Sequence, residues 1–413
     1  MTNTLVKAKN TSNSSLFTNF LTHSGVCRIF FTHLTNYTKL SFILLLFYLP
    51  VAAQVDFDEV DVELYTFGVG ENYWEAFGHS ALRIKINEID YMYGFGYFDF
   101  DDEDFFTKFA KGQMRYFLGV EETSSEIDNY INQGRTVWSQ QLDLSALQKQ
   151  QLINKLNFLA LVENRYYSYD YFLNNCTSKI RDLLDEVTNG EISEQLKGVH
   201  TSKSWNDLTF PVKNQSLMNL GIAIAYGVPA YQARDKWNLS VFPIDFARDL
   251  GQINTKTGWN GGLIEHNKSA SHLSEFSFVN THYAAIIFVA VVLLGLFIPY
   301  LTKIVAYSWL VLQSLIGVSL LFLWFLSEHS VAAWNINLLL FSPFAFLLLN
   351  RNIFNQLKTL FLISNVLWII LALILTNIYL IGFSMINMVL IYRLLRRGVH
   401  RFPISSLNYF KMK

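Results

Sequence analysis

Apolar positions fill the last third of the chain, whereas before them apolar and polar positions are mixed. Between residues 283 and 350 the only charged residues are Lys303 and Glu328, and the stretch 359–392 has none. A helix needs ~20 residues to cross a bilayer, so the pattern predicts five membrane spans. These are 283–301, 304–326, 334–349, 359–376 and 378–394, of which the third is short and contains Pro343.

The basic residues predict which way the spans point. They fall in alternate connections and in the C-terminal tail: Lys303, Arg351, Lys358, Arg393, Arg396, Arg397, Arg401, Lys411 and Lys413. The other connections, 327–333 and 376–377, carry none. Basic connections face the cytoplasm, so the polar part before residue 283 is expected outside, on the same side as the loop 327–337.

The N-terminus predicts export as well. Lys39 is followed by LSFILLLFYLPVAAQ, an apolar run that ends in small residues, as a secretory signal peptide does. The alternative is an uncleaved anchor, although the run is short for a span. Cleavage near Ala53 or Gln54 would remove Cys27 and leave Cys176 as the only thiol, without a partner for an internal disulfide.

The outer part shows both strand and helix periodicity. Residues 60–69, 78–86 and 89–95 are typical of strands, and 101–112 and 144–162 of helices. In CTSKIRDLLDEV, the apolar residues at 176, 180, 183 and 187 form one stripe of a helix, and Asn174 and Asn175 stand before it as N-cap residues.

Cys176 would then lie in the first turn of that helix, on the inward stripe. The free backbone N–H groups and the helix dipole there favour a thiolate and could hold an oxyanion. Such a nucleophile needs a base. Of His79, His200, His266, His272 and His282, the last three lie in a polar stretch typical of a linker. His79 begins an alternating strand and is the preferred candidate, although a lone Cys and a lone His are more often structural.

Composition excludes several other functions. The formal net charge is −1, and no basic stripe indicates nucleic-acid binding. A single mature cysteine and no histidine pair argue against a metal site, and GVGEN (68–72) is too short for a dinucleotide loop. No cofactor is expected.

Three segments resemble a known family: FGHSALRI (77–84), YGFGYFDFDDEDFFTKFAKGQMRYFLG (93–119) and YDYFLNNCTSKIRDLL (169–184). They are similar to the periplasmic domain of the Lnb-type bacterial lipoprotein N-acyltransferases, and EHSVAAWNINLLLFSP (328–343) fits their membrane part. The resemblance implies an α+β, circularly permuted papain-like (NlpC-like) periplasmic domain, followed by an all-α transmembrane domain of about five helices. The expected domains are 1–54 (N-terminal extension and signal peptide), 55–282 (Cys-His domain and linker), 283–397 (membrane helices) and 398–413 (basic cytoplasmic tail).

The resemblance also implies a chemistry and its residues. Cys176 would be the nucleophile and His79 the base. The family tends to have an Asn near the position of Met92, where this chain has no Asn. The candidates for the orienting or oxyanion group are therefore Asn175, Asp90, Tyr93 and Asp99. The acyl donor would be a phospholipid of the bacterial inner membrane, and the acceptor the N-terminal amine of a diacylglyceryl lipoprotein.

Two other functions compete with this one. A membrane-anchored papain-like hydrolase could cleave peptidoglycan peptides or lipid esters, although such an enzyme needs at most one anchor. A non-enzymatic assembly protein would have an inert, buried Cys176. Glu328, His329, Asn335 and Asn337 are candidates for positioning lipid or acceptor, and helix packing explains them equally well.

Overall fold

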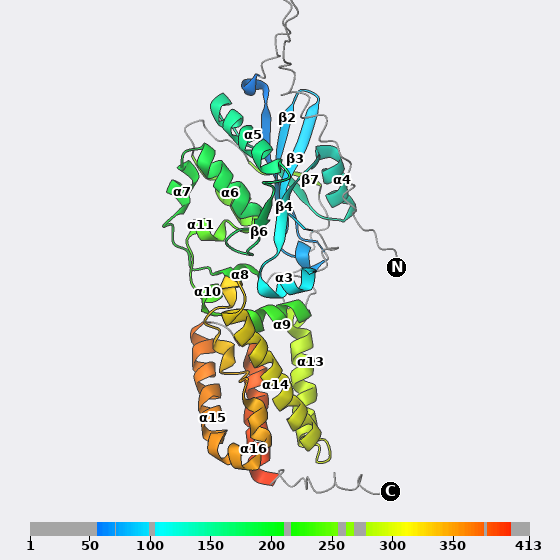
Figure 1. The fold of residues 1–413 in the computed structure, drawn as a ribbon, viewed down its shortest axis with the longest axis vertical. Helices are drawn as coiled ribbons and strands as arrows, with labels where there is room; N and C mark the ends of the chain where they lie inside the picture. The colour runs from blue at the N-terminus through cyan, green and yellow to red at the C-terminus, as the bar shows by residue number, and fades with distance from the viewer. Residues whose placement is uncertain are drawn as a thin grey trace, which may run out of the picture. The chain divides into compact units, whose positions relative to one another are not determined.

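The computed structural model describes residues 56–70, 72–98, 104–209, 216–254, 262–267, 278–375 and 378–397. The predicted signal peptide, Cys27, Asp99, His272, the hairpin at 376–377 and the basic tail 398–413 lie outside the described residues. Residues 56–413 form one compact unit, which consists of an α+β part and a helical part (Figure 1).

A seven-stranded antiparallel sheet forms the centre of the α+β part. Its strands are β1 (Asp61–Phe67), β2 (His79–Ile86), β3 (Ile89–Tyr97), β4 (Arg115–Glu122), β5 (Val137–Gln141), β6 (Tyr166–Ser168) and β7 (Ile264–Asn267). Their order across the sheet is β6-β4-β3-β2-β1-β5-β7. The three predicted strands are β1, β2 and β3. β7 falls in the stretch that was predicted to be a linker, because its pairing partner β5 is distant in sequence.

Helices cover both faces of the sheet (Figure 1). α5 (Ala146–Ala160) and α6 (Cys176–Val187) pack on one face, and α4 (Thr123–Asn132) packs on the other. The short helix α3 (Phe105–Lys111) joins β3 to β4 and ends at Gly112, whose φ of +71° is a left-handed conformation that glycine adopts easily. The helices predicted over 101–112 and 144–162 therefore correspond to α3 and α5, with shorter bounds.

Smaller helices follow α6 and lead toward the membrane part. They are α7 (Glu191–Leu196), α8 (Trp205–Thr209), α9 (Ser216–Ala225), α10 (Val228–Tyr231), α11 (Lys236–Leu239) and α12 (Pro243–Leu250). A cluster of buried aromatic residues, including Phe172, Trp205 and Phe242, packs them against the turn before α6 and against Val331 of the membrane part.

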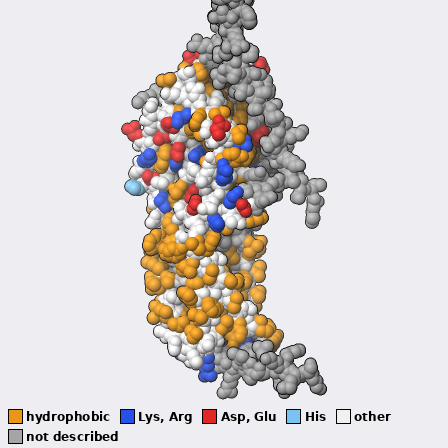
Figure 2. Space-filling model, viewed as in Figure 1, with side chains coloured by type: hydrophobic (Ala, Val, Ile, Leu, Met, Phe, Trp, Pro, Cys, Tyr) orange, Lys and Arg blue, Asp and Glu red, His pale blue; other side chains and the backbone are white. Residues whose placement is uncertain are grey.

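Four α-helices make up most of the membrane part: α13 (Phe278–Phe297), α14 (Thr302–Phe325), α15 (Arg351–Ile374) and α16 (Ile381–Arg397). By length and composition, α14 and α15 can each span a membrane, and α13 and α16 contain shorter apolar stretches. Hydrophobic side chains cover this part, whereas charged ones gather over the α+β part (Figure 2). The helical membrane domain that the sequence predicted is confirmed.

The third predicted span, 334–349, differs from the prediction because it is not an α-helix. It consists of the 3-10 helices η4 (Ile336–Leu338) and η5 (Ala345–Leu349), and η3 (Ser330–Ala332) precedes it. Pro343 lacks an N–H and interrupts helical hydrogen bonding. A β-carbon on Gly317 of α14 would stand 2.3 Å from the carbonyl oxygen of Phe341, so the two backbones touch.

Candidate functional site

Cys176 is the first residue of α6, and Asn175 is its N-cap, as predicted. The Asn175 Oδ1 accepts a hydrogen bond from the backbone N–H of Ser178 (2.8 Å). Its Nδ2 donates to the carbonyl oxygens of Tyr171 (2.9 Å) and Val241 (2.8 Å). Both ends of the Asn175 amide therefore support the helix start, and the oxyanion role considered for this side chain is not the one that its contacts favour.

The structure brings His79 and Cys176 together at Gly96, near the end of β3. If Gly96 carried a β-carbon, that atom would stand 3.5 Å from the Cβ of Cys176 and 3.8 Å from the Cε1 of His79, so both side chains lie next to Gly96. Gly96 has a φ of +103°, which also favours glycine. The next residues of the two elements touch as well, because the Ser80 and Thr177 hydroxyls are 3.1 Å apart. The start of β2 and the start of α6 thus form one site.

Burial determines the charge state of both groups. Cys176 is 8% exposed, and burial raises the pKa of its thiol, although N–H groups of Ser80 and Thr177 oppose this by donating to the sulfur. Burial, together with the nearby Arg135 guanidinium, lowers the pKa of His79 to about 3. The first turn of a helix predicted a thiolate, but desolvation outweighs the helix terminus here. The resting pair is therefore a neutral thiol beside a neutral imidazole.

Aromatic rings, rather than a hydrogen bond, surround the imidazole of His79. Phe67 and Tyr130 lie nearly parallel to it at centroid distances of 6.1 and 6.2 Å, and Tyr97 meets it edge-on at 6.3 Å. The buried Nε2 of His79 has no hydrogen-bond partner among the described residues. A β-carbon on Gly94 would stand 3.2 Å from that nitrogen, so the strand passes beside it without a side chain that could bind it.

Asp90 and Tyr93, which were considered as orienting groups, have partners other than His79. Asp90 pairs with Lys85 across β2 and β3, six residues from His79 and so roughly 20 Å away. Its carboxylate accepts two hydrogen bonds from Arg83, which lower its pKa. Tyr93 donates to Asn157 Oδ1 of α5 at 3.1 Å. Asp99 lies outside the described residues.

Two residues of the site, the half-buried Tyr97 and the buried Arg135, were missed from the sequence. Tyr97 donates to Glu126 Oε1 at 2.8 Å, which anchors the ring that faces His79. Arg135 is 4% exposed, donates from Nε to the carbonyl oxygen of Gly68 (2.8 Å) and lies over the Tyr130 ring at 4.4 Å. No spacing relates these residues to His79 of β2, because Tyr97 is in β3 and Arg135 lies between α4 and β5, and only folding brings these segments together.

The other outer-domain histidines have different surroundings. His266 is in β7, where its Nε2 lies 2.8 Å from the Ser139 hydroxyl, so it is not in a linker. His282 is buried in α13, stacked on Tyr379. His200 forms an isolated bridge with Asp235. Of the described histidines, His79 is therefore the one placed beside Cys176.

The loop after α14 docks on the α+β part. Glu328 donates its backbone N–H to the carbonyl oxygen of Lys111 and accepts from Gln113 Nε2, both at 2.8 Å. His329 Nε2 lies 2.9 Å from the carbonyl oxygen of Phe109, and Ser330 donates to Asp170 Oδ2 at 3.0 Å. Asp170 precedes Cys176 by only six residues, so the membrane part contacts the segment that leads into the nucleophile.

Asn335 and Asn337 hold the C-terminus of α9. The Nδ2 atoms donate to carbonyl oxygens of residues 223–225 at 2.8–3.0 Å. Trp368 Nε1 of α15 donates to Asn337 Oδ1 at 2.9 Å. These carbonyls end a helix and need donors, so the contacts favour the packing role over lipid positioning.

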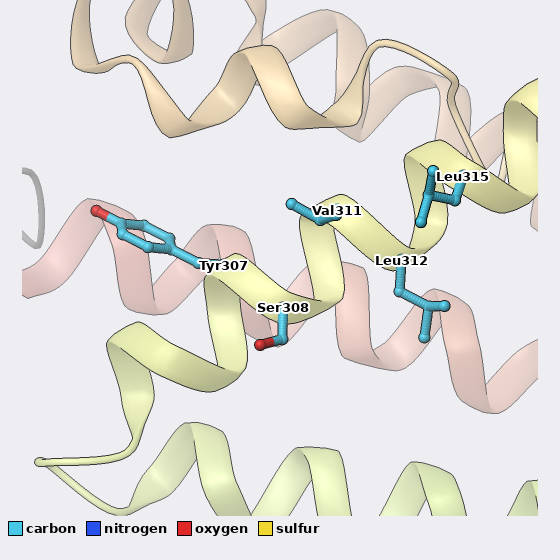
Figure 3. A pocket seen from close by; sticks show the side chains of 5 residues that line it. All are labelled: Tyr307, Ser308, Val311, Leu312 and Leu315. Atoms are coloured by element: carbon cyan, nitrogen blue, oxygen red, sulfur yellow. The ribbon is translucent and has the colours of Figure 1, made fainter.

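A surface cavity of about 440 Å³ lies on α14, lined by Tyr307, Ser308, Val311, Leu312 and Leu315 (Figure 3). Leu315 is ten residues, or about 15 Å along the helix, from the α14 end that approaches the α+β part. The cavity is therefore separate from the Cys176 site. Among the described residues, no group of three or more His, Cys, Asp or Glu side chains could hold a metal ion.

The fold and the site define a membrane protein with an extramembrane α+β domain that places a histidine beside a buried cysteine. Two family models match this chain: the Lnb N-terminal periplasmic domain over residues 48–208 and the Lnb transmembrane domain over residues 272–404. Together they cover most of its 413 residues. The chain belongs to the Lnb family and is a membrane protein with a periplasmic N-terminal domain. No curated protein and no solved structure matches it.

Proposed function

We propose that this protein is a lipoprotein N-acyltransferase, which moves an acyl chain from a phospholipid to the N-terminal amine of a diacylglyceryl lipoprotein. The observation that carries the proposal is the meeting of Cys176 and His79 at Gly96, in a domain docked on a membrane bundle. Membership of the Lnb family supports it. Both substrates are held in a membrane, so a site close to the bilayer gains proximity.

The first step is acyl transfer to the protein. His79 takes the proton of the Cys176 thiol as the sulfur attacks the ester carbonyl of the phospholipid. With a pKa lowered to about 3, the imidazole of His79 is neutral before the attack and can accept the proton. Backbone N–H groups at the start of α6 are suited to hold the oxyanion. Collapse expels the lysophospholipid alkoxide, which takes the proton from His79 and leaves a thioester on Cys176.

The second step transfers the acyl group to the acceptor. The α-amine attacks the thioester, its proton passes to His79, and the Cys176 sulfur leaves and recovers that proton as a thiol. The products are an N-acylated lipoprotein and the free enzyme. Burial of Cys176 favours an amine over water as the acceptor, because it limits access of water to the thioester.

We further propose that the C-terminus is cytoplasmic and that the α+β domain faces the outer leaflet of the inner membrane. The basic residues of the connections and the signal-like N-terminus support this topology. The domain divisions at residues 54, 282 and 397 belong to the same proposal.

The test uses the purified full chain in phospholipid vesicles. We expect intact-mass spectrometry to detect one added acyl chain, which hydroxylamine removes and which Cys176→Ser lacks. Addition of a diacylated lipopeptide should discharge the adduct and yield the triacylated product. His79→Ala should lose both steps, whereas the matched control His200→Ala keeps them.

Two results would count against the proposal. One is release of free fatty acid with no triacylated peptide, which indicates a hydrolase. The other is formation of the triacylated peptide by Cys176→Ser at the normal rate, which removes the thiol from the reaction.

A further inference from the structure

α3 presents aromatic side chains to its surroundings. Phe106 is 83% exposed and Phe109 is 37% exposed, on a helix of seven residues. Exposed phenylalanines of this kind are unusual on the surface of a water-soluble domain, and neighbouring ones indicate an interaction surface. The described neighbours of Phe106 leave most of its ring uncovered.

The position of α3 relative to the membrane follows from its contacts. The carbonyl oxygens of Phe109 and Lys111 bind His329 and Glu328, three or four residues beyond the end of α14 at Phe325. A β-carbon on Gly112 would stand 3.1 Å from the Glu328 backbone. α3 is therefore attached to the outer end of a helix that is long and apolar enough to cross the bilayer.

Other aromatic residues lie at the same end of α14 and in the segment that follows it. Trp324 stacks on Phe325 at 4.6 Å and contacts Trp334 at 5.2 Å, and Phe325 and Trp334 are 65% and 68% exposed. Tryptophan at the end of a span is typical of the interface between acyl chains and headgroups. α3 thus continues an aromatic border at the outer end of α14.

We propose that α3 is a membrane-interface element, which buries Phe106 and Phe109 at the headgroup boundary of the bilayer that α14 spans. The occupant of this surface is phospholipid. α3 carries Lys108 and Lys111, but the four acids 101–104 precede it in the sequence, so the charge of this segment as a whole does not favour an anionic surface and aromatic burial supplies the attraction. Insertion should therefore be the same in zwitterionic and anionic bilayers.

A row of rings connects α3 to the nucleophile. Phe105 stacks near Phe98, Phe98 contacts Tyr116, and Tyr116 stacks on Tyr169 at 4.1 Å. Tyr169 is near enough to Cys176 that a thiolate there would help raise the pKa of the Tyr169 hydroxyl, after the larger effect of burial. Resting on the proposed function, α3 would bring the ester of an acyl donor out of the bilayer beside this row and toward Cys176.

The experiment uses a spin label to measure how deeply residue 106 lies in the bilayer, and this measurement does not depend on acyl transfer. In a Cys27→Ser, Cys176→Ser background the chain has no other thiol. A nitroxide is attached to Phe106→Cys, and its accessibility to oxygen and to a water-soluble nickel chelate is compared in vesicles. Leu315→Cys on α14 and Phe158→Cys on α5, both 60% exposed, serve as the membrane and water references.

The label at 106 is expected to favour oxygen over the nickel chelate, as at 315, with a shallower depth. Its depth should match in phosphatidylcholine vesicles with and without phosphatidylglycerol. Nickel accessibility equal to that at 158 would overturn the proposal, and so would insertion only in the anionic vesicles.

A second variant links the surface to the reaction. Phe106→Asp should slow acylation of Cys176 from vesicle phospholipid at least tenfold, whereas acylation by a water-soluble short-chain thioester stays unchanged. Phe158→Asp is the matched control. An equal loss with both donors contradicts a membrane role for Phe106. If the proposed function is wrong, the wild type will show no acylation of Cys176, whereas the depth of the label at residue 106 can still be measured.

Discussion

The charge state of the Cys176–His79 pair has a sharp experimental consequence. Burial raises the pKa of the thiol above its ordinary 9.0, and the pKa of His79 falls to about 3. A thiol with a pKa of 9.0 is ionised to about 1% at pH 7, and a higher pKa lowers that fraction tenfold per unit. The resting protein should therefore contain almost no thiolate at neutral pH, and the imidazole should carry no charge above about pH 4.

The assay is the rate of alkylation by iodoacetamide between pH 5 and pH 10, followed by intact-mass spectrometry. A Cys27→Ser chain has Cys176 as its only thiol. We expect the logarithm of the rate to rise by about one per pH unit up to pH 9 and beyond, because only the thiolate reacts. The same protein unfolded in guanidinium chloride should reach its plateau at a lower pH, and the offset measures the effect of burial.

His79→Ala separates a general base from an ion pair. Because the neutral imidazole does not stabilise a thiolate in the resting state, this variant should keep the alkylation profile of the parent. It should nevertheless lose acyl transfer by roughly 10²–10⁴-fold, the usual contribution of a general base. A flat alkylation rate between pH 5 and pH 8 that disappears in His79→Ala would refute the reasoning, because it is the behaviour of a thiolate–imidazolium pair.

Two further substitutions test the packing around the site and within the membrane part. In Gly119→Ala, the new β-carbon would stand 2.7 Å from the Tyr97 ring, so the ring must leave its present position beside His79. We expect a loss of activity of up to about a hundredfold and of about 1–3 kcal/mol of stability. Unchanged activity would show that Tyr97 does not position the base. In Asn387→Leu, the Trp309 Nε1–H and the Leu340 carbonyl oxygen lose their hydrogen-bond partner, at 2.8 and 3.0 Å, inside the buried bundle. Leaving such groups unpaired costs about 1–3 kcal/mol each, so the melting temperature in detergent should fall. The control Met385→Leu, at an exposed position of the same helix, should leave the melting temperature unchanged.

The sequence predicted those features that depend on local patterns. Alternation identified β1, β2 and β3, and the stripe behind Asn175 identified α6 with its N-cap. Long apolar runs predicted a helical membrane domain. The family resemblance predicted that His79 and Cys176 meet, which periodicity alone cannot show, because 96 residues separate them in the chain.

Features that depend on contacts between distant segments could not be predicted from the sequence. The 3-10 path of residues 336–349 follows from Pro343 and from the close approach of the Phe341 backbone to Gly317, which only the packed bundle reveals. The role of Asn337 likewise required knowledge that it lies beside the end of α9.

The charge state of the site shows most clearly what each level determines. The sequence by itself determined that Cys176 begins a helix, a position that favours a thiolate. The tertiary structure decided that the thiol is neutral, because the start of α6 packs against β2 and β3, and burial there raises the pKa of the thiol. Desolvation depends on every neighbour within several ångströms, and those neighbours include residues of β2 and β3, which only folding brings against the start of α6.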